Sequence, residues 1–319
     1  MNILFIFTGG TIGSRTHNGI ISTESDIPYI LIDSYKSLYG IDFSFKTVSP
    51  YTILSENSNG SYIKQLSDTV NDALSSGSYD GIIVAHGTDT LLFSADIISL
   101  LTRTDSIPIC FVSSAYPPEE PEANALDNLH AAVNIIKSGN YSGTMVPYRN
   151  HDNKVYVHRP LYLLEAQPFN DELFSLRNRY MDVFDNGNFI DGSRYDHERY
   201  ISDLSRLRQL TSVTVTGKAL SEECKHILHI NPFPGISYPD IPQGTRYILH
   251  ESFHSGTINT VSENAKAFFK EAYEKNIPVY LTGVYGGASY ESTKEFDRLH
   301  IIPVNELSPT AVYCRLMLG

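Results

Sequence analysis

The chain has 319 residues, of which 41% are hydrophobic and 19% charged, and a formal net charge of -12 at pH 7. This length suits one large or two medium domains, and the composition is that of a globular protein with a sizeable core, not of a disordered chain. The acidic balance excludes nucleic acid or an anionic membrane as the main partner, because both require a basic surface.

The apolar runs are short. Stretches such as "GIIVA" and "SIPICFV" are strand-sized, well below the roughly 20 residues of a membrane helix. The N-terminal "MNILFIF" has no basic start and no cleavage site, so no secretory signal is expected. The three cysteines, Cys110, Cys224 and Cys314, are odd in number and too widely spaced for a disulfide framework or a metal motif. We therefore expect a cytoplasmic protein with reduced thiols and no metal.

The first half of the chain alternates Ile- and Val-rich runs with helical stretches, which predicts a parallel sheet flanked by helices. Small polar residues follow the apolar part of each of the runs at 2–7, 81–86 and 107–114. Strands are predicted at 2–7, 81–86, 107–114 and 154–160, and helices at 61–74, 90–101 and 127–137.

The character changes between residues 182 and 223, where the chain is polar, rich in Tyr and Asp and without a firm period, as in a linker or covering segment. Alternation then resumes. Strands are predicted at 226–235, 246–253 and 277–283, and helices at 260–276 and 308–318, the last with Ser308 as cap and Pro309 in its first turn. We divide the chain into a domain at 1–185, a linker at 186–223 and a second α/β domain at 224–319.

The first strand runs into the turn Thr8-Gly9-Gly10-Thr11. A dinucleotide-binding turn needs the spacing G-x-G-x-x-G before a helix, whereas this turn reads G-G-x-x-G before a polar, loop-like stretch. A purely structural turn is the default for a lone pair of glycines. However, Thr11 follows two glycines that let another group approach closely, a position that suits a nucleophile.

A second polar turn follows the strand at 81–86. The sequence there reads His86-Gly87-Thr88-Asp89-Thr90 and continues into an apolar helix. In a parallel sheet, chemistry collects where the carboxyl ends of the strands meet. We therefore expect threonine hydroxyls, a carboxylate and backbone amides from both turns to converge on one crevice.

The two turns, "TGGTIGS" and "HGTDT", resemble the two signature motifs of the bacterial-type L-asparaginases and of the related tRNA-linked amidotransferase subunit. Weaker similarity covers the rest of the chain, including "FPGIS" and "SPTAVYCRLM". The resemblance implies an N-terminal flavodoxin-like parallel-sheet domain, a smaller C-terminal α/β domain, and homodimers or homotetramers with sites at subunit contacts. It also implies an amidohydrolase that uses no cofactor.

Roles transfer from the resemblance to matching positions only. Thr11 is the expected nucleophile, Thr88 faces it, and Asp89 holds the α-ammonium of the substrate. Gly10 and Gly87 line the substrate site, and backbone N–H groups near Gly10 and Thr88 form the expected oxyanion hole. In "LSENSNG", which resembles the family's substrate loop, we assign the substrate α-carboxylate to Ser58, with Asn59 beside it.

Three positions depart from the family pattern. Ile20 stands where the family has an activating loop tyrosine, and Asn124 stands where an Asp is common. Most consequentially, Glu165 occupies the position of the lysine that pairs with the second Thr and Asp. A carboxylate there would lie close to Asp89, which would raise the pKa of one of the two and allow them to act as an acid–base pair. The alternatives are a different register, with Lys154 or Arg159 reaching the site, or a loss of catalysis.

Other residues are weaker candidates for the site. Tyr29 and Tyr35 could replace the loop tyrosine, although each is as readily explained by packing. His86 suits a hydrogen-bonded scaffold role better than that of a base. A C-terminal loop, which the family places near a neighbouring subunit's site, carries His250, Glu251, Ser252, His254 and Thr257.

Two hypotheses follow from the sequence. The first is an asparaginase-type amidohydrolase that cleaves the side-chain amide of L-asparagine or a related small amide, such as that of a modified amino acid or a small peptide. The second is a catalytically impaired protein on the same scaffold that binds or senses an amino acid or peptide. The intact Thr11, Thr88 and Asp89 favour the enzyme, and the replaced Tyr and Lys favour the binding protein. A dinucleotide-dependent enzyme is a distant third.

Overall fold

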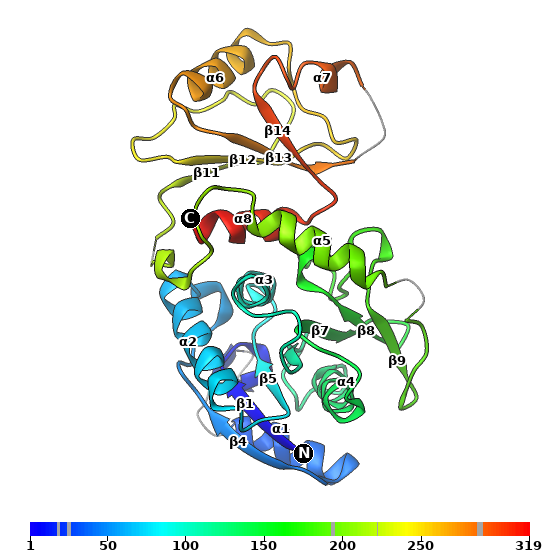
Figure 1. Ribbon diagram of the computed structural model, residues 1–319. Coiled ribbons are helices and arrows are strands. Elements are labelled where there is room, and N and C mark those ends of the chain that lie inside the picture. Colours follow the sequence, from blue (N-terminus) through cyan, green and yellow to red (C-terminus); the bar gives the residue numbers. More distant parts are fainter. Residues whose placement is uncertain (18–19, 24–26, 193–194, 222, 286–289) are drawn as a thin grey trace.

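The computed structural model describes residues 1–319 apart from 18–19, 24–26, 193–194, 222 and 286–289, and it leaves the side chains of 13–29 undescribed. The described chain forms an eight-stranded sheet and a four-stranded sheet, each flanked by helices (Figure 1), and a separate two-stranded hairpin. This arrangement confirms the predicted α/β fold.

The larger sheet contains the first ten strands except for the hairpin of β2 (Ser14–His17) and β3 (Ile20–Thr23), and its order is β10-β9-β8-β7-β6-β5-β1-β4. Its strands are β1 Asn2–Phe7, β4 Ser44–Val48, β5 Gly81–Ala85, β6 Ile109–Val112, β7 Thr144–Arg149, β8 Val155–His158, β9 Asp182–Asp185 and β10 Asn188–Phe189. The strands from β4 to β7 pair in parallel, and β8 to β10 extend the sheet antiparallel. The parallel part has the strand order of flavodoxin-like folds, as predicted.

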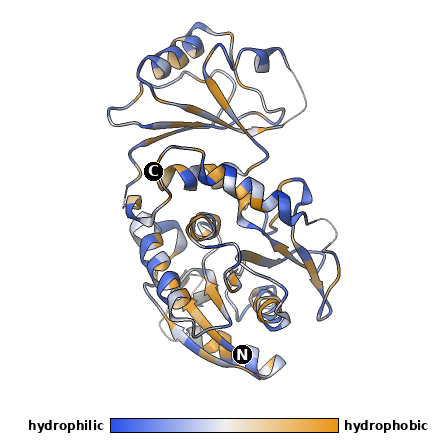
Figure 2. Cartoon of the chain, viewed as in Figure 1, coloured by the Kyte–Doolittle hydropathy of each residue, from blue (hydrophilic) through white to orange (hydrophobic). Residues whose placement is uncertain are grey.

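Helices cover both faces of the parallel part. They are α1 Ile27–Tyr39, α2 Gly60–Ser76, α3 Leu91–Leu101 and α4 Ala125–Ser138. Side chains alternate along β1, so that Ile3, Phe5 and Phe7 pack with α1 and α4, while Leu4 and Ile6 pack with α2 and α3. This burial on both faces explains why the central strands read as continuous apolar runs, which Figure 2 shows as hydrophobic arrows.

The smaller sheet is parallel throughout, in the order β11-β12-β13-β14. Its strands are β11 Ile227–Ile230, β12 Tyr247–His250, β13 Val279–Val284 and β14 Ile301–Asn305. One face packs on α6 (Glu263–Glu274) through Phe268 and Phe269. The short helix α7 (Glu291–Lys294) precedes β14.

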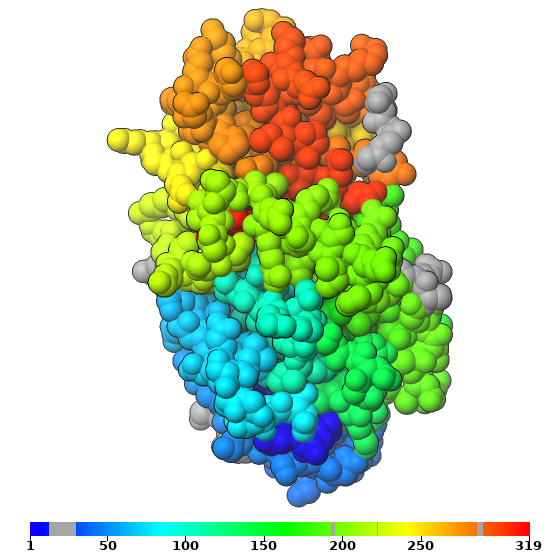
Figure 3. All heavy atoms as spheres, viewed as in Figure 1, coloured from blue at the N-terminus to red at the C-terminus, as the bar shows by residue number. Residues whose placement is uncertain are grey.

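Helix α8 (Pro309–Met317) lies between the two sheets and packs on α3 (Figure 1). Its buried side chains share one core with Tyr247, Leu249 and Tyr280 of the smaller sheet and with residues of α3. The side chain of Ser308 caps its first turn, as predicted, by accepting from the N–H of Ala311 at 3.1 Å. In the space-filling view, α5 (His197–Arg208) and the chain that follows it cover the seam between the two lobes (Figure 3).

Several elements depart from the pattern expected of the sequence. Strand β7 contains Pro147, and β4 is a polar edge strand with an exposed pattern, so neither shows a clear strand period. The segment predicted as a linker, 186–223, contains β10 and α5. Three residues of α5, Tyr200, Leu204 and Leu207, are buried in the core beside α8, which makes the segment part of the fold.

Candidate functional site

The site lies at the carboxyl ends of β1 and β5. These strands pair in parallel with Phe7 opposite Ala85, so the turns that follow them leave the sheet at the same edge. After β1 the chain adds β4 on one side of it, and it then adds β5, β6 and β7 in turn on the other side. The point between β1 and β5, where the strand order reverses, is where open α/β sheets form a crevice. The predicted convergence of the two polar turns is therefore present.

A third segment, Ile53 to Ser55, joins the two turns. The N–H of Ile53 donates to the carbonyl of Thr8 at 3.1 Å, and the N–H of Gly10 donates to the carbonyl of Ile53 at 2.8 Å. The N–H of Thr8 donates to Ala85 at 3.1 Å. Backbone hydrogen bonds thus hold the first turn between β5 and the loop that precedes α2.

The glycines of the turns are required by this close approach. Gly9 and Gly10 have φ angles of 95° and 74°, in the left-handed region that glycine favours. A Cβ on Gly10 would lie 2.2 Å from Cα of Gly87, and a Cβ on Gly87 would lie 2.5 Å from the side chain of Ser55. The three segments touch through their backbones, so no side chain fits between them.

Five polar side chains lie around this contact. Thr11 and Thr88 are half-buried, and Asp89 is exposed just before α3. The hydroxyl of Ser55 donates to Oδ2 of Asp89 at 3.0 Å, and the Thr90 hydroxyl donates to the Ser55 carbonyl at 2.9 Å. The position of Asp89 at the N-terminal end of α3 also favours its negative charge, because helix N-terminal ends carry partial positive charge.

His86 is a scaffold residue, in agreement with the prediction. Its Nδ1 lies 2.8 Å from the Gly87 carbonyl, which can only accept, so Nδ1 carries the proton and donates. Its Nε2 then accepts from the hydroxyl of Ser94 at 2.9 Å. Burial lowers the pKa of His86 to about 4, so the ring is neutral near pH 7. Both nitrogens are used, which leaves His86 no capacity to act as a base.

Ser58 and Asn59, the residues assigned to the substrate carboxylate, do not contact Asp89 as Ser55 does. Asn59 is the N-cap of α2, and its Oδ1 accepts from the N–H groups of Ser61 and Tyr62. The Ser58 hydroxyl is buried without a partner among the described residues and lines a closed space with Tyr51 that has no room for a water molecule. Ser55, three residues earlier in the same loop, is the serine that reaches the carboxylate of Asp89.

Glu165 is exposed, and its Oε1 accepts from the hydroxyl of Thr310 in the first turn of α8 at 2.6 Å. Within the described part of the chain, no hydrogen bond or ion pair joins Glu165 to Thr88 or Asp89. The structure thus shows Glu165 as a contact to the last helix.

The proposed replacements for the missing lysine lie elsewhere. Arg159 is buried, and its guanidinium donates to the carbonyls of Ser142 and Thr144. Lys154 lies at the tip of the β7–β8 hairpin, next to β8. Arg159 is therefore held beside the start of β7 by structural hydrogen bonds.

Asn124 bridges two strand ends, since its side chain accepts from the N–H of Ala115 and donates to the carbonyl of Arg149. Tyr35 is buried in α1 with its hydroxyl 3.2 Å from Nδ1 of His130, and burial raises its pKa to about 12. Both are accounted for by packing. The side chains of Ile20 and Tyr29 lie outside the described residues.

The N–H of Gly10 donates to the Ile53 carbonyl, so the oxyanion donor expected near Gly10 would have to be a neighbouring backbone N–H. Thr88 has no backbone acceptor for its N–H among the described residues, and it remains a candidate donor. The arrangement therefore offers two threonine hydroxyls, a carboxylate with its serine, and a backbone donor at one strand edge.

The C-terminal loop lies in the other lobe. His250 ends β12, fully buried, with Nε2 2.9 Å from the Tyr238 hydroxyl and Nδ1 against the carbonyl of Glu251. The carboxylate of Glu251 pairs with His229 at 2.8 Å. In the described part of a single chain, none of these residues contacts the turns after β1 and β5.

Three further features bear on ligands. Among the described residues, no group of three His, Cys, Asp or Glu side chains is arranged to hold a metal ion. Over the same residues, no helix is long and apolar enough to cross a membrane. The three cysteines are free thiols, with Cys110 and Cys314 buried and Cys224 half-buried.

Comparison with known proteins gives consistent matches. The family model described as "Asparaginase, N-terminal" matches residues 2–170. A glutamyl-tRNA(Gln) amidotransferase subunit from Methanobrevibacter smithii is 24% identical over 336 aligned positions, covering 99% of this chain and 71% of that protein. An L-asparaginase from Thermococcus kodakarensis is 26% identical over 250 positions, covering 75% of this chain and 69% of that one.

Solved structures agree on the fold. The thermostable L-asparaginase from Thermococcus kodakarensis superposes with a TM-score of 0.77 at 20% sequence identity, covering 100% of this chain and 92% of that chain. The likeness extends over both sheets, since it covers the whole chain.

Proposed function

Because the chain belongs to the asparaginase family, we propose that it hydrolyses the side-chain amide of L-asparagine or a related small amide, with Thr11 as the nucleophile. The observation that carries the proposal is the contact of the two turns. Thr11 and the pair Thr88 and Asp89 leave neighbouring parallel strands at the same edge, and the glycines at their contact bring the backbones together.

The proposed reaction has two steps. The Thr11 hydroxyl oxygen bonds to the amide carbon, its proton passes to the departing nitrogen, and the C–N bond breaks to release ammonia and leave an ester on Thr11. Water then attacks the ester carbon and gives one proton back to the Thr11 oxygen, which frees the acid. The Thr88 hydroxyl, on the facing turn, is the proposed relay for these protons, and the Thr88 N–H is a proposed donor to the developing oxyanion.

Asp89 is proposed to bind the α-ammonium of the substrate. Its exposed carboxylate accepts from Ser55 through one oxygen, which orients it and leaves lone pairs for a cation. Ser58 is kept as the proposed partner of the substrate α-carboxylate, because its hydroxyl has no partner among the described residues, whereas Ser55 donates its single hydroxyl proton to Asp89. The substrate class is therefore an amide that carries a free ammonium group.

The identity of the amide is the open part of the proposal. Relatives include proteins named L-asparaginase and others named as a glutamyl-tRNA(Gln) amidotransferase subunit. The resemblance assigns Glu165 to the position of the family lysine, and Glu165 contacts Thr310. We propose that the second turn works without that cation. An amide larger than asparagine is consistent with this change. A homodimer or homotetramer and a cytoplasmic location belong to the same proposal.

The second candidate is a binding or sensing protein on this scaffold. It is favoured by Glu165, which the resemblance places at the position of the family lysine and which accepts a hydrogen bond from Thr310. Such a protein would retain Asp89 and Ser55 for an amino acid and would release no ammonia.

The test is ammonia release from L-Asn, D-Asn, L-Gln and Asn-containing dipeptides. We expect Thr11→Ala to lower kcat by about a thousandfold or more on the best amide, because the step through the hydroxyl is lost. We expect Asp89→Asn to act mainly on KM, because it weakens ground-state binding of the ammonium. The matched control is Thr69→Ala in α2, where the hydroxyl bonds to the Gln65 carbonyl of the same helix, and it should leave both constants unchanged.

Two outcomes would contradict the enzyme. Ammonia release that survives in Thr11→Ala would remove the nucleophile. A silent wild type that still binds an amino acid by calorimetry, with binding lost in Asp89→Asn, would establish the binding protein instead.

A further inference from the structure

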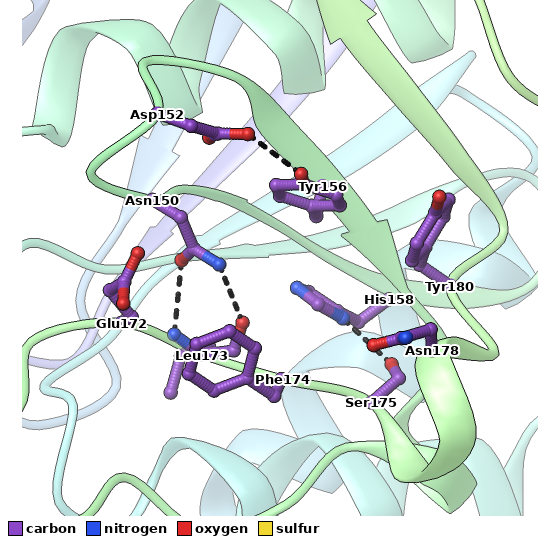
Figure 4. A pocket seen from close by; sticks show the side chains of 10 residues that line it. All are labelled: Asn150, Asp152, Tyr156, His158, Glu172, Leu173, Phe174, Ser175, Asn178 and Tyr180. Carbon is purple, nitrogen blue, oxygen red and sulfur yellow. Dashed lines mark hydrogen bonds between the residues drawn. The ribbon is translucent and has the colours of Figure 1, made fainter.

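A pocket of about 350 Å³ lies away from the two turns, between the β7–β8 hairpin and the segment 172–180 (Figure 4). The side chain of Asn150 in the hairpin accepts from the N–H of Leu173 at 3.0 Å and donates to the Leu173 carbonyl at 2.9 Å. This pair of bonds holds the two walls at a set distance. The pocket is therefore part of the folded structure, within the size range of small-molecule sites.

His158 in the wall has a nitrogen without a partner. The ring is 1% exposed, and its Nδ1 lies 2.7 Å from the hydroxyl of Ser175. Its Nε2 is buried and has no hydrogen-bond partner among the described residues. In Figure 4 this second nitrogen points toward the space between Asn150, Tyr156 and Phe174. Burial lowers the pKa of His158 to about 3, so the ring is neutral. A buried polar atom without a hydrogen-bond partner is uncommon in folded proteins, so a ligand group that bonds to Nε2 would satisfy it.

The charges around the pocket are negative. Asp152 and Glu172 both line it, and neither Lys nor Arg is among the lining residues. Four arginines adjoin lining residues in sequence, and each has partners outside the lining. Arg177 and Arg179 pair with Glu306, Arg149 pairs with Asp127, and Arg159 donates to the carbonyls of Ser142 and Thr144. The basic neighbours in the hairpin, His151 and Lys154, also lie outside the lining, and His151 pairs with Asp171.

Aromatic rings form much of the remaining wall. Tyr156 and Tyr180 pack edge to face with ring centroids 5.1 Å apart, and Phe174 is 45% exposed. The hydroxyl of Tyr156 donates to Asp152 at 2.8 Å, which ties the carboxylate to the ring. Aromatic faces beside carboxylates favour organic cations, because both attract positive charge.

We propose that this pocket binds a small organic amine that also carries one hydrogen-bonding group. The ammonium lies at Asp152 and Glu172, the body of the ligand packs on Tyr156 and Phe174, and the second polar group bonds to Nε2 of His158. The site is separate from the proposed reaction of Thr11, and it does not depend on that reaction.

Three compounds separate these contacts by calorimetry: tyramine has both groups, phenethylamine lacks the hydroxyl, and 4-ethylphenol lacks the ammonium. We expect tyramine to bind, phenethylamine to bind about tenfold more weakly, and 4-ethylphenol to bind at least about tenfold more weakly. Each loss corresponds to one unmade contact. Tyramine should bind Thr11→Ala as it binds wild type, which keeps this result independent of the proposed catalysis.

Variants test the residues. The double variant Asp152→Asn with Glu172→Gln should weaken tyramine binding at least about tenfold, while Asp72→Asn with Glu274→Gln, two exposed carboxylates elsewhere, should not change it although the net charge changes equally. Phe174→Ala, at an exposed position that folding tolerates, should weaken binding about threefold. Equal binding of tyramine to wild type and to the Asp152 and Glu172 variant would overturn the proposal, as would no binding up to about 10 mM.

Discussion

At the residue scale, glycine decides the geometry of the site. Gly10 combines a positive φ with a position directly against the backbone of Gly87, so two constraints act on one residue. Gly77, the C-cap of α2, has a positive φ of 61° but nothing within 4 Å of its missing Cβ. A substitution at Gly77 therefore tests the cost of the left-handed φ alone, and one at Gly10 tests that cost together with the steric clash.

We expect Gly10→Ala to destabilise the protein by more than about 3 kcal/mol, because a left-handed φ and an overpacked contact both add to its cost. Gly77→Ala should cost only about 1 kcal/mol, since φ alone acts there. Urea unfolding of both variants measures the difference. Equal losses in the two would mean that the turn relaxes around the new methyl group and that the contact with Gly87 is not rigid.

At the element scale, helix α3 carries a buried carboxyl group without hydrogen-bond partners among the described residues. Asp96 of α3 is fully buried, and neither of its carboxylate oxygens has a partner among the described residues. Burial raises its pKa well above the usual range. Asp203 of α5 is also buried, but its carboxylate accepts from the Tyr162 hydroxyl at 2.8 Å and pairs with Arg206. Asp96 and Asp203 can therefore be compared as two buried aspartates, the first without hydrogen-bond partners and the second with them.

We expect Asp96→Asn to stabilise the protein by roughly 2 kcal/mol at pH 7.5, because it removes the cost of keeping an ionisable group in a dry contact. A group whose pKa is raised by folding destabilises above its unfolded pKa, so the gain should shrink as the pH falls toward 4. Asp203→Asn should destabilise instead, because it weakens satisfied bonds. Chemical denaturation of the three proteins at pH 7.5 and 5 is the measurement, and a loss of stability in Asp96→Asn would contradict the assignment.

At the scale of the whole molecule, three buried histidines set the response to acid. Burial lowers the pKa of His86 and His250 to about 4 and that of His158 to about 3, against an ordinary value of 6.5. They lie in both lobes, and each is neutral in the folded chain. Unfolding exposes them to water, where they take up protons below pH 6.5.

The folded state therefore binds fewer protons than the unfolded state below pH 6.5, and the free energy of unfolding should fall as the pH drops from 6.5 toward 4. Each histidine contributes about 2 kcal/mol of this loss at pH 5. Asp96 acts with the opposite sign, so the loss should be steeper in Asp96→Asn than in wild type. Unfolding free energies at pH 7.5, 6.5, 5.5 and 5 give the slope, and a flat profile would show that these rings are protonated in the folded state.

The features that the sequence determined by itself are local. Continuous apolar runs predicted the buried strands β1, β5 and β6, and the polar turns after two of them predicted the place of the site, because parallel strands end at a common edge. The cap of α8 at Ser308 was readable for the same reason, since a capping bond spans three residues. Each of these depends on neighbours in the chain.

The tertiary structure alone decided which side chains meet across long separations. Ser55 reaches Asp89 over 34 residues and Glu165 reaches Thr310 over 145. The family resemblance, which is read from local motifs, pointed to Ser58 for the substrate carboxylate and to a pair of carboxylates at Glu165 and Asp89. The pocket at His158 joins a hairpin to a segment with no regular period. Such contacts depend on how strands order and helices pack, and the hydrophobic pattern specifies which face of an element is buried but not which distant side chain lies against it.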